Sequence, residues 1–286
     1  MQVLKIDSQV KAFIRLEDGA NVGLIQAEAG MLLIDTASSP ADIRGLLSAV
    51  DARPEQVNQV VNTHFHTDHT WGNQLFDCPI LAHRLCLERM RLSLQDEWSV
   101  AELHAYVTEL EKTNPQKAEE LRLLLQELRI KLPNQVFEQK AEAEIGILNY
   151  MVIHMGGHTP DSAIVWLPER GILFAADLIF QGRYPYLFDA NIPDWIAALQ
   201  RLIEYQAQVI IPGHGVRCSD ADIAHLKNYL QETWDRAREH IRQGHTIEET
   251  VIDAAFPIFA PGKYEKLHQA NIRYIYEQIA SPPLGE

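Results

Sequence analysis

Apolar residues in the first third of the chain form short runs separated by turn residues, a pattern typical of β-strands. The segments NVGLIQAEAG and MLLIDT predict two strands joined by a turn at Gly30, and PADIRGLLSAV, which follows, has helical spacing. QVVN then predicts a short buried strand that runs directly into THFHTDH. Because α/β proteins commonly place their chemistry on loops at the carboxyl ends of strands, this loop is the first candidate site.

A different pattern runs from about residue 85 to 132, where Leu, Glu, Arg and Gln recur at helical spacing and Asn114-Pro115 marks a break. It predicts a helical insertion, which could act as a lid. The amphipathic stretch ELRLLLQELRIKL within it has acidic neighbours, which favour a packed lid or a dimer face over a helix lying on a membrane. Whether such a lid is mobile is left open.

Three strand-like runs follow the insertion, and each ends beside a histidine or an aspartate. FEQKAEAEIGILNYMVIHMGG precedes His158, SAIVWLPERGILFAAD ends on Asp177, and QVIIPGHG carries His214 at its end. Packing alone gives no reason for these residue types to recur where strands end. From about residue 219 to 282 the pattern is helical again, which predicts a C-terminal extension that could cover a site, form a homodimer interface, or do both.

Composition narrows the classes of function. The 286 residues are 47% hydrophobic, enough for one large core, and we expect a single domain over residues 1–286 with the insertion and the extension added. The net charge of −14 argues against nucleic acid as a partner and favours a small-molecule substrate. Three cysteines without CxxC spacing resemble reduced thiols, and no apolar run approaches a membrane span, so we expect a cytoplasmic protein without a membrane partner.

The segment THFHTDH has the composition of a metal site. Alternation along an extended segment points His64 and His66 the same way, and the tight turn that follows brings Asp68 and His69 to a neighbouring position. Most single histidines are structural or solvated, but four ligand-type residues within six positions favour metal binding. Imidazole and carboxylate ligands favour zinc, with iron or manganese as alternatives.

These motifs together resemble the metallo-β-lactamase superfamily. The resemblance rests on HxHxDH at residues 64–69, GHTP at 157–160, AD at 176–177 and PGHG at 212–215, and it extends from about residue 21 to 215. It implies an α/β fold, a four-layered αβ/βα sandwich with the metals at one edge. The run from residue 156 to 180, with the segments after it, is most similar to a bacterial subgroup of quinoprotein-relay-type metallohydrolases.

The resemblance also implies a ligand set for two divalent metal ions. His64, His66 and His158 would hold the first ion, Asp68, His69 and His214 the second, and Asp177 would bridge the two. Asp35, which ends MLLIDT, matches a family carboxylate that supports the HxHxDH loop without binding metal, although an ordinary turn or N-cap aspartate is an equally good interpretation.

The type of reaction follows from the ligands. A hydroxide shared by two metals can attack the carbonyl of an ester, lactone or thioester, and Asp68 is the candidate for orienting it and moving its proton. Asp177 favours carboxylate-bridged branches over dedicated β-lactamases, which usually carry cysteine or serine there. Residues close to the ligands could recognise the substrate, with one tyrosine donating to the oxyanion: Trp71, Arg183, Tyr184 and Tyr186.

Several alternatives share this ligand set. The same site could hydrolyse β-lactams or phosphodiesters, and a mononuclear iron oxygenase of the persulfide-dioxygenase type uses part of it. The segment TWGN at residues 70–73 echoes the glyoxalase II branch, but the context of His214 and the helical insertion do not. A non-catalytic metal-binding module is the non-enzymatic alternative. The remaining histidines, among them His83 and His154, are expected to be structural or solvated.

Overall fold

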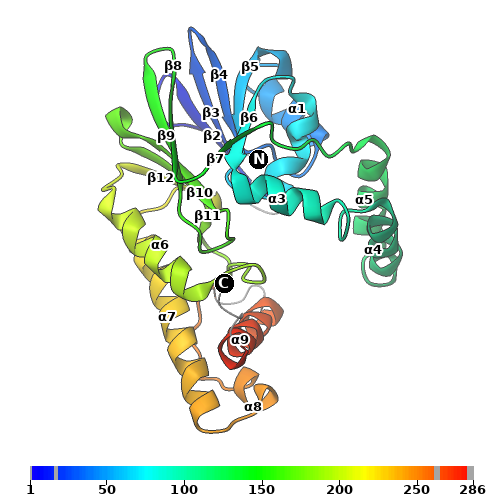
Figure 1. Ribbon diagram of the computed structural model, residues 1–286, viewed down its shortest axis with the longest axis vertical. Helices are drawn as coiled ribbons and strands as arrows, with labels where there is room; N and C mark the ends of the chain where they lie inside the picture. The colour runs from blue at the N-terminus through cyan, green and yellow to red at the C-terminus, as the bar shows by residue number, and fades with distance from the viewer. Residues whose placement is uncertain (1, 16–18, 261–264, 282–286) are drawn as a thin grey trace. The chain divides into compact units, whose positions relative to one another are not determined.

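The computed structural model describes residues 2–15, 19–260 and 265–281, and the chain divides into two compact units, Met1–His154 and Met155–Glu286 (Figure 1). Figure 1 labels the helices and strands named below. Each unit has its own sheet strands, its own helices and its own share of the candidate ligands.

The first unit contains, among its described residues, a seven-stranded sheet in chain order. Strands β1 to β4 pair antiparallel, and β4 to β7 pair parallel. The strands are β1 (Gln2–Lys5), β2 (Val10–Ile14), β3 (Val22–Ala27), β4 (Gly30–Ile34), β5 (Val57–Val61), β6 (Ile80–His83) and β7 (Gln135–Phe137). An antiparallel hairpin, β8 (Lys140–Ile145) with β9 (Leu148–His154), completes the unit.

Helix α1 (Pro40–Ser48) covers part of this sheet because its apolar side chains recur at helical spacing. Ser39 caps the helix by accepting the Asp42 N–H, and Pro40 takes the first turn, where its missing N–H costs nothing. The helix buries Ile43, Leu46 and Leu47 in a core cluster with residues of β2 to β6.

The turn between β3 and β4 lies one position earlier than the sequence predicts. Glu28 and Ala29 form the turn, and Gly30 already pairs with Ala27 as the first residue of β4. Gly30 adopts φ +143°, and a Cβ there would lie 1.9 Å from Asn58 Oδ1. The glycine therefore serves a close approach inside the sheet rather than the turn itself.

Three helices occupy the stretch of the predicted insertion: α3 (Arg84–Ser93), α4 (Val100–Thr113) and α5 (Pro115–Glu127). Asn114 ends α4 and caps α5 by accepting the Lys117 N–H, so the predicted break separates two helices that lie side by side (Figure 1). These helices share a second core cluster with the ligand loop through Phe65, Trp71 and Trp98.

The second unit is built around strands β10 (Ala163–Leu167), β11 (Ile172–Phe180) and β12 (Val209–His214). β10 and β11 are antiparallel, whereas β11 and β12 are parallel and joined through α6 (Ile192–Glu204). Helices α7 (Asp220–Arg242), α8 (Ile247–Val251) and α9 (Glu265–Ala280) follow. α7 packs against α6 and α9, as expected for helices with one apolar face.

Asp177 does not end its strand, as the sequence suggests, because β11 continues to Phe180. The register with β12 shifts on both sides of Ala176, which has φ +47°. This bulge interrupts the regular pairing beside Asp177, whereas His214 is the last residue of β12, as predicted.

Across the residues that the structure describes, no helix is both long enough and apolar enough to cross a bilayer.

Candidate metal site in two clusters

The first cluster lies in the loop directly after β5. His64 is 1% exposed and His69 is fully buried, and the short helix α2 (Thr67–Thr70) supplies the turn that the sequence predicts after His66. His64 Nε2 lies 3.1 Å from His66 Nδ1. The two imidazoles therefore present their nitrogens to one point.

Asp35 supports this loop from the end of β4. Its Oδ1 accepts the Thr63 N–H at 2.7 Å, and its Oδ2 accepts the Thr63 hydroxyl and lies 2.7 Å from His69 Nδ1. Because Nδ1 of His69 is held by this carboxylate, Nε2 is the nitrogen left to bind a metal. Asp35 is 2% exposed and adopts φ +64°, a conformation that aspartate and asparagine tolerate better than most residues.

A buried polar network holds the rest of the loop, and the sequence analysis did not assign it. The carbonyl of His69 accepts from Thr36 Oγ1 and Asn62 Nδ2, each at 3.1 Å. Asn73 Oδ1 accepts from the same two groups, and its own amide donates back to Asn62 Oδ1 at 2.8 Å. A Cβ on Gly72 would lie 2.0 Å from the Thr36 carbonyl, so glycine is required there. The TWGN segment was the only sequence signal for this network.

The second cluster lies in the second unit, where three buried side chains converge. His158 Nε2 is 3.5 Å and His214 Nε2 is 3.3 Å from the same oxygen, Asp177 Oδ2. The three residues are 0%, 6% and 3% exposed, respectively. They come from the loop after β9, the end of β12 and the bulge in β11.

Glycine lets the chain approach Asp177 closely. A Cβ on Gly213 would lie 1.8 Å from Asp177 Oδ1, so the PGHG motif keeps room for the carboxylate beside its histidine. A Cβ on Gly157, which has φ +95°, would lie 2.7 Å from Cα of Trp195. The glycines that flank His158 and His214 are thus packing requirements of the site.

Both clusters have donor-atom separations that fit a metal ion. Two ligands about 2.0–2.1 Å from one tetrahedral zinc lie roughly 3.3–3.4 Å apart. The observed separations of 3.1, 3.3 and 3.5 Å bracket that value. All seven predicted ligands are among the side chains that could hold a metal ion.

The residues predicted to contact substrate lie in different environments. Trp71 is buried beside Asp68, and both line a cavity of the first unit. In the second unit Tyr184 is 3% exposed, stacks on His268 and accepts the Phe259 N–H at 3.3 Å. Tyr186 is 42% exposed and packs edge-on against a phenylalanine, and Arg183 is partly buried.

Among the remaining histidines, His83 and His154 form a stacked pair with ring centroids 3.9 Å apart. His83 Nδ1 accepts the Leu85 N–H at the start of α3. Burial and then the neighbouring His154 lower the pKa of His83 to about 4, so the imidazole is neutral at pH 7. This pair is structural, as the sequence predicts for histidines outside the motifs.

The motifs and the two clusters match known proteins of one class. The family model described as the Metallo-beta-lactamase superfamily matches residues 15–214, and the chain therefore belongs to this superfamily. The chain is 26% identical over 208 residues to the acyl-coenzyme A thioesterase MBLAC2 of Gallus gallus, covering 68% of this chain and 72% of that protein. It is a metal-dependent hydrolase of the superfamily with histidine and aspartate ligands.

A second relative, the linear primary-alkylsulfatase of Pseudomonas sp., is 20% identical over 92% of this chain, and the chain spans 55% of that protein. Solved structures show the same fold. A metallo-beta-lactamase from Pontibacter korlensis covers 80% of this chain and 98% of its own, with 23% identity and TM-score 0.62. The sec-alkylsulfatase Pisa1 from Pseudomonas sp. covers 99% of this chain and 52% of its own, with 16% identity and TM-score 0.75.

Proposed function

We propose that the chain hydrolyses the carbonyl of an ester, thioester or lactone at a pair of divalent metal ions, with zinc as the favoured metal. The observation that carries the proposal is the spacing of the donor atoms. Two imidazole nitrogens lie 3.1 Å apart in the first unit, and one oxygen of Asp177 lies 3.3 and 3.5 Å from two imidazole nitrogens in the second. These are separations of ligands around one ion.

The seven ligands would be divided between the two ions in the pattern of the superfamily. His64, His66 and His158 would hold one ion, and the second would be held by Asp68, His69 and His214. Asp177, which already faces two histidine nitrogens through one oxygen, would be shared by both ions. A shared carboxylate sets this chain apart from members with cysteine or serine at that position.

Bound divalent ions would polarise the carbonyl oxygen and lower the pKa of a water towards about 7. The chain's own residues would move the proton and orient the ligands. Asp68 would accept the proton of the attacking water and return it to the leaving oxygen or sulfur. Asp35 holds Nδ1 of His69, so Nε2 is the nitrogen that would bind the ion, and Thr63 links the same carboxylate to His64.

The relatives support a thioester or ester as the substrate. The protein named acyl-coenzyme A thioesterase is 26% identical to this chain over 68% of its length. A sulfate ester is the second candidate, because the likeness to the alkylsulfatases extends over 92% to 99% of this chain, more than the residues 15–214 that the family model matches.

A hydrolase panel on protein of known metal content tests the proposal. It should contain acyl thioesters, aryl esters, a lactone, a β-lactam, a phosphodiester and an alkyl sulfate. We expect turnover of thioester or ester that is lost in His66→Ala and kept in His104→Ala, which changes an exposed histidine of α4. A metal-loaded preparation that hydrolyses no carbonyl substrate would overturn the proposal, and turnover of the alkyl sulfate alone would favour the second candidate.

A further inference from the structure

A cavity of about 920 Å³ lies within the first unit, and the ligand candidate Asp68 forms part of its wall. Its volume falls within the range of roughly 300–1,000 Å³ that is usual for small-molecule sites. The cavity extends from the ligand loop to α4 and α5, two of the three helices of the insertion. A substrate group attached to a carbonyl at Asp68 could therefore extend into it.

Large apolar side chains form much of the wall away from Asp68, alongside the charged residues Glu97, Lys117, Glu120 and Glu127. Trp71 and Trp98 line it next to the loop, and α4 and α5 add a row of large side chains: Leu103, Tyr106, Leu110, Leu121, Leu123 and Leu124. Tyr106 and Leu123 are each 56% exposed, which is unusual for side chains of this size on neighbouring helices. An apolar ligand would remove this surface from water.

The charged groups of the cavity do not favour an anionic ligand. Five carboxylate residues line it against two cationic ones, Arg15 and Lys117. Arg15 is engaged with Asp42 at 2.7 Å. With five carboxylates against two cations, the lining is net negative and does not favour a phosphate or a nucleotide, so the apolar part of the substrate is the part that fits.

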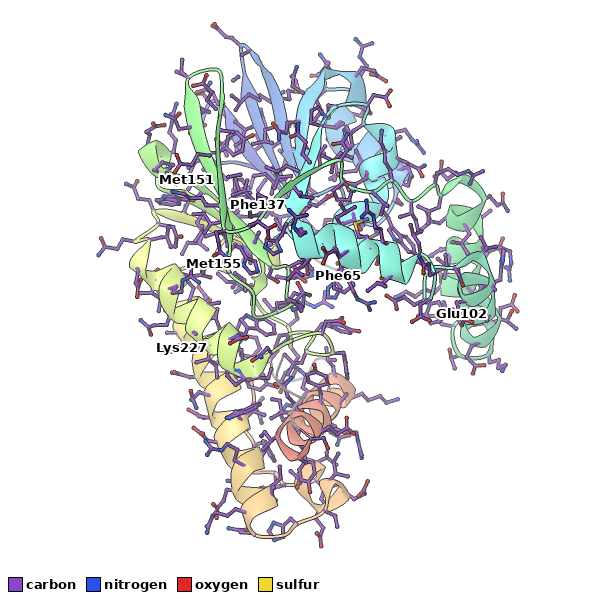
Figure 2. The ribbon with its side chains drawn as sticks, viewed as in Figure 1. Phe65, Glu102, Phe137, Met151, Met155 and Lys227 are labelled. Atoms are coloured by element: carbon purple, nitrogen blue, oxygen red, sulfur yellow. The ribbon has the colours of Figure 1, made fainter. Side chains whose placement is uncertain are left out.

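We propose that this cavity binds the unbranched apolar chain of an acyl ester or thioester, and that α4 and α5 set the preferred chain length. The proposal rests on the proposed function and names its substrate class. Each buried methylene contributes up to about fourfold in kcat/KM until the cavity is filled. The helical insertion, whose side chains Figure 2 draws as sticks, is then the specificity-determining part of the first unit.

Two exposed leucines provide a matched pair of variants. Leu123 lines the cavity and is 56% exposed, whereas Leu92 on α3 is 59% exposed and lies outside the lining. Leu123→Gln should lower kcat/KM for a decanoyl ester by about three- to tenfold and leave the acetyl ester within about twofold of the wild type. Leu92→Gln should change neither, and Leu121→Gln should repeat the selective loss.

Binding without turnover provides an independent readout. In metal-free protein, a neutral ester brominated close to its carbonyl, such as methyl 4-bromodecanoate, should quench tryptophan fluorescence, because Trp71 and Trp98 line the cavity next to the ligand loop. Trp98→Phe should remove part of the quenching. If acetyl and decanoyl esters are hydrolysed with equal kcat/KM and the brominated probe does not quench, the cavity proposal is overturned and the proposed function is kept. Quenching without hydrolysis of any ester would overturn the proposed function and support the cavity.

Discussion

Replacing Asp35 by asparagine tests the support of the ligand loop with little change of shape. Asparagine tolerates the φ of +64° found here and keeps an oxygen for the Thr63 N–H. Its amide group, however, would stand where Oδ2 now faces the Thr63 hydroxyl and His69 Nδ1, each at 2.7 Å. The amide would donate where Oδ2 now accepts, so the Thr63 hydroxyl would have to reverse its hydrogen bond and His69 could no longer donate from Nδ1.

Each lost hydrogen bond to a charged group is worth about 1.5–3 kcal/mol. Because His69 would lose the partner that fixes its tautomer, we expect metal affinity to fall about 10- to 100-fold. The assay is a Zn²⁺ titration of metal-free protein against a competing chelator. Asp7→Asn is the matched control, because Asp7 also accepts backbone N–H groups but lies in the β1–β2 turn. Unchanged zinc affinity in folded Asp35→Asn would refute the reasoning.

Three further predictions concern single residues. Gly213→Ala should lower the free energy of unfolding by about 1–3 kcal/mol and weaken metal binding, because the new Cβ would lie 1.8 Å from Asp177 Oδ1. The control, Gly45→Ala in the middle of α1, should raise the free energy of unfolding by about 0.5–1 kcal/mol. Urea unfolding measures both changes. The folded-state pKa of His83 is about 4, below its ordinary 6.5, so its contribution to stability is complete above pH 6.5 and is lost as the pH falls towards 4. In metal-free His83→Asn, the free energy of unfolding should fall less steeply between pH 6.5 and pH 4 than in the wild type. Equal slopes in the two proteins would contradict this prediction. Tyr186→Phe should lower kcat about 100-fold if its hydroxyl stabilises the oxyanion, whereas unchanged turnover would remove it from the reaction.

The resemblance to the superfamily implied the fold class and the ligand set, and it could be seen in the sequence because the motifs that carry it are short. HxHxDH places four ligand-type residues within six positions, and the structure keeps His64 and His66 facing one point. Strand rhythm predicted β3, β4, β5 and β12 because alternation and turn residues are local features.

What the sequence could not predict depends on contacts between distant residues. Asp35 could have been an ordinary turn residue, and only its contact with His69, 34 positions away, distinguishes the two interpretations. The Thr36, Asn62 and Asn73 network is likewise assembled from separate loops. Asp177 was expected at a strand end because the bulge at Ala176 appears only when β11 pairs with β12.

The packing of the helical insertion also could not be predicted from the sequence. Leucines of α4 and α5 predict amphipathic helices, but the sequence cannot tell which apolar side chains pack and which line a cavity. In the structure Leu121 and Leu124 do both, whereas Leu123 is 56% exposed and lines the cavity. The single-domain organisation, the homodimer and the mobility of a lid stay predictions.

The metal content of the purified chain tests the central claim most directly. Metal-free protein would be loaded with Zn²⁺, desalted and analysed by elemental mass spectrometry. We predict two ions per chain in the wild type and in His104→Ala, and a loss of at least one ion in His66→Ala. A wild-type protein that retains no metal, or a His66→Ala variant that binds as much as the wild type, would contradict the account.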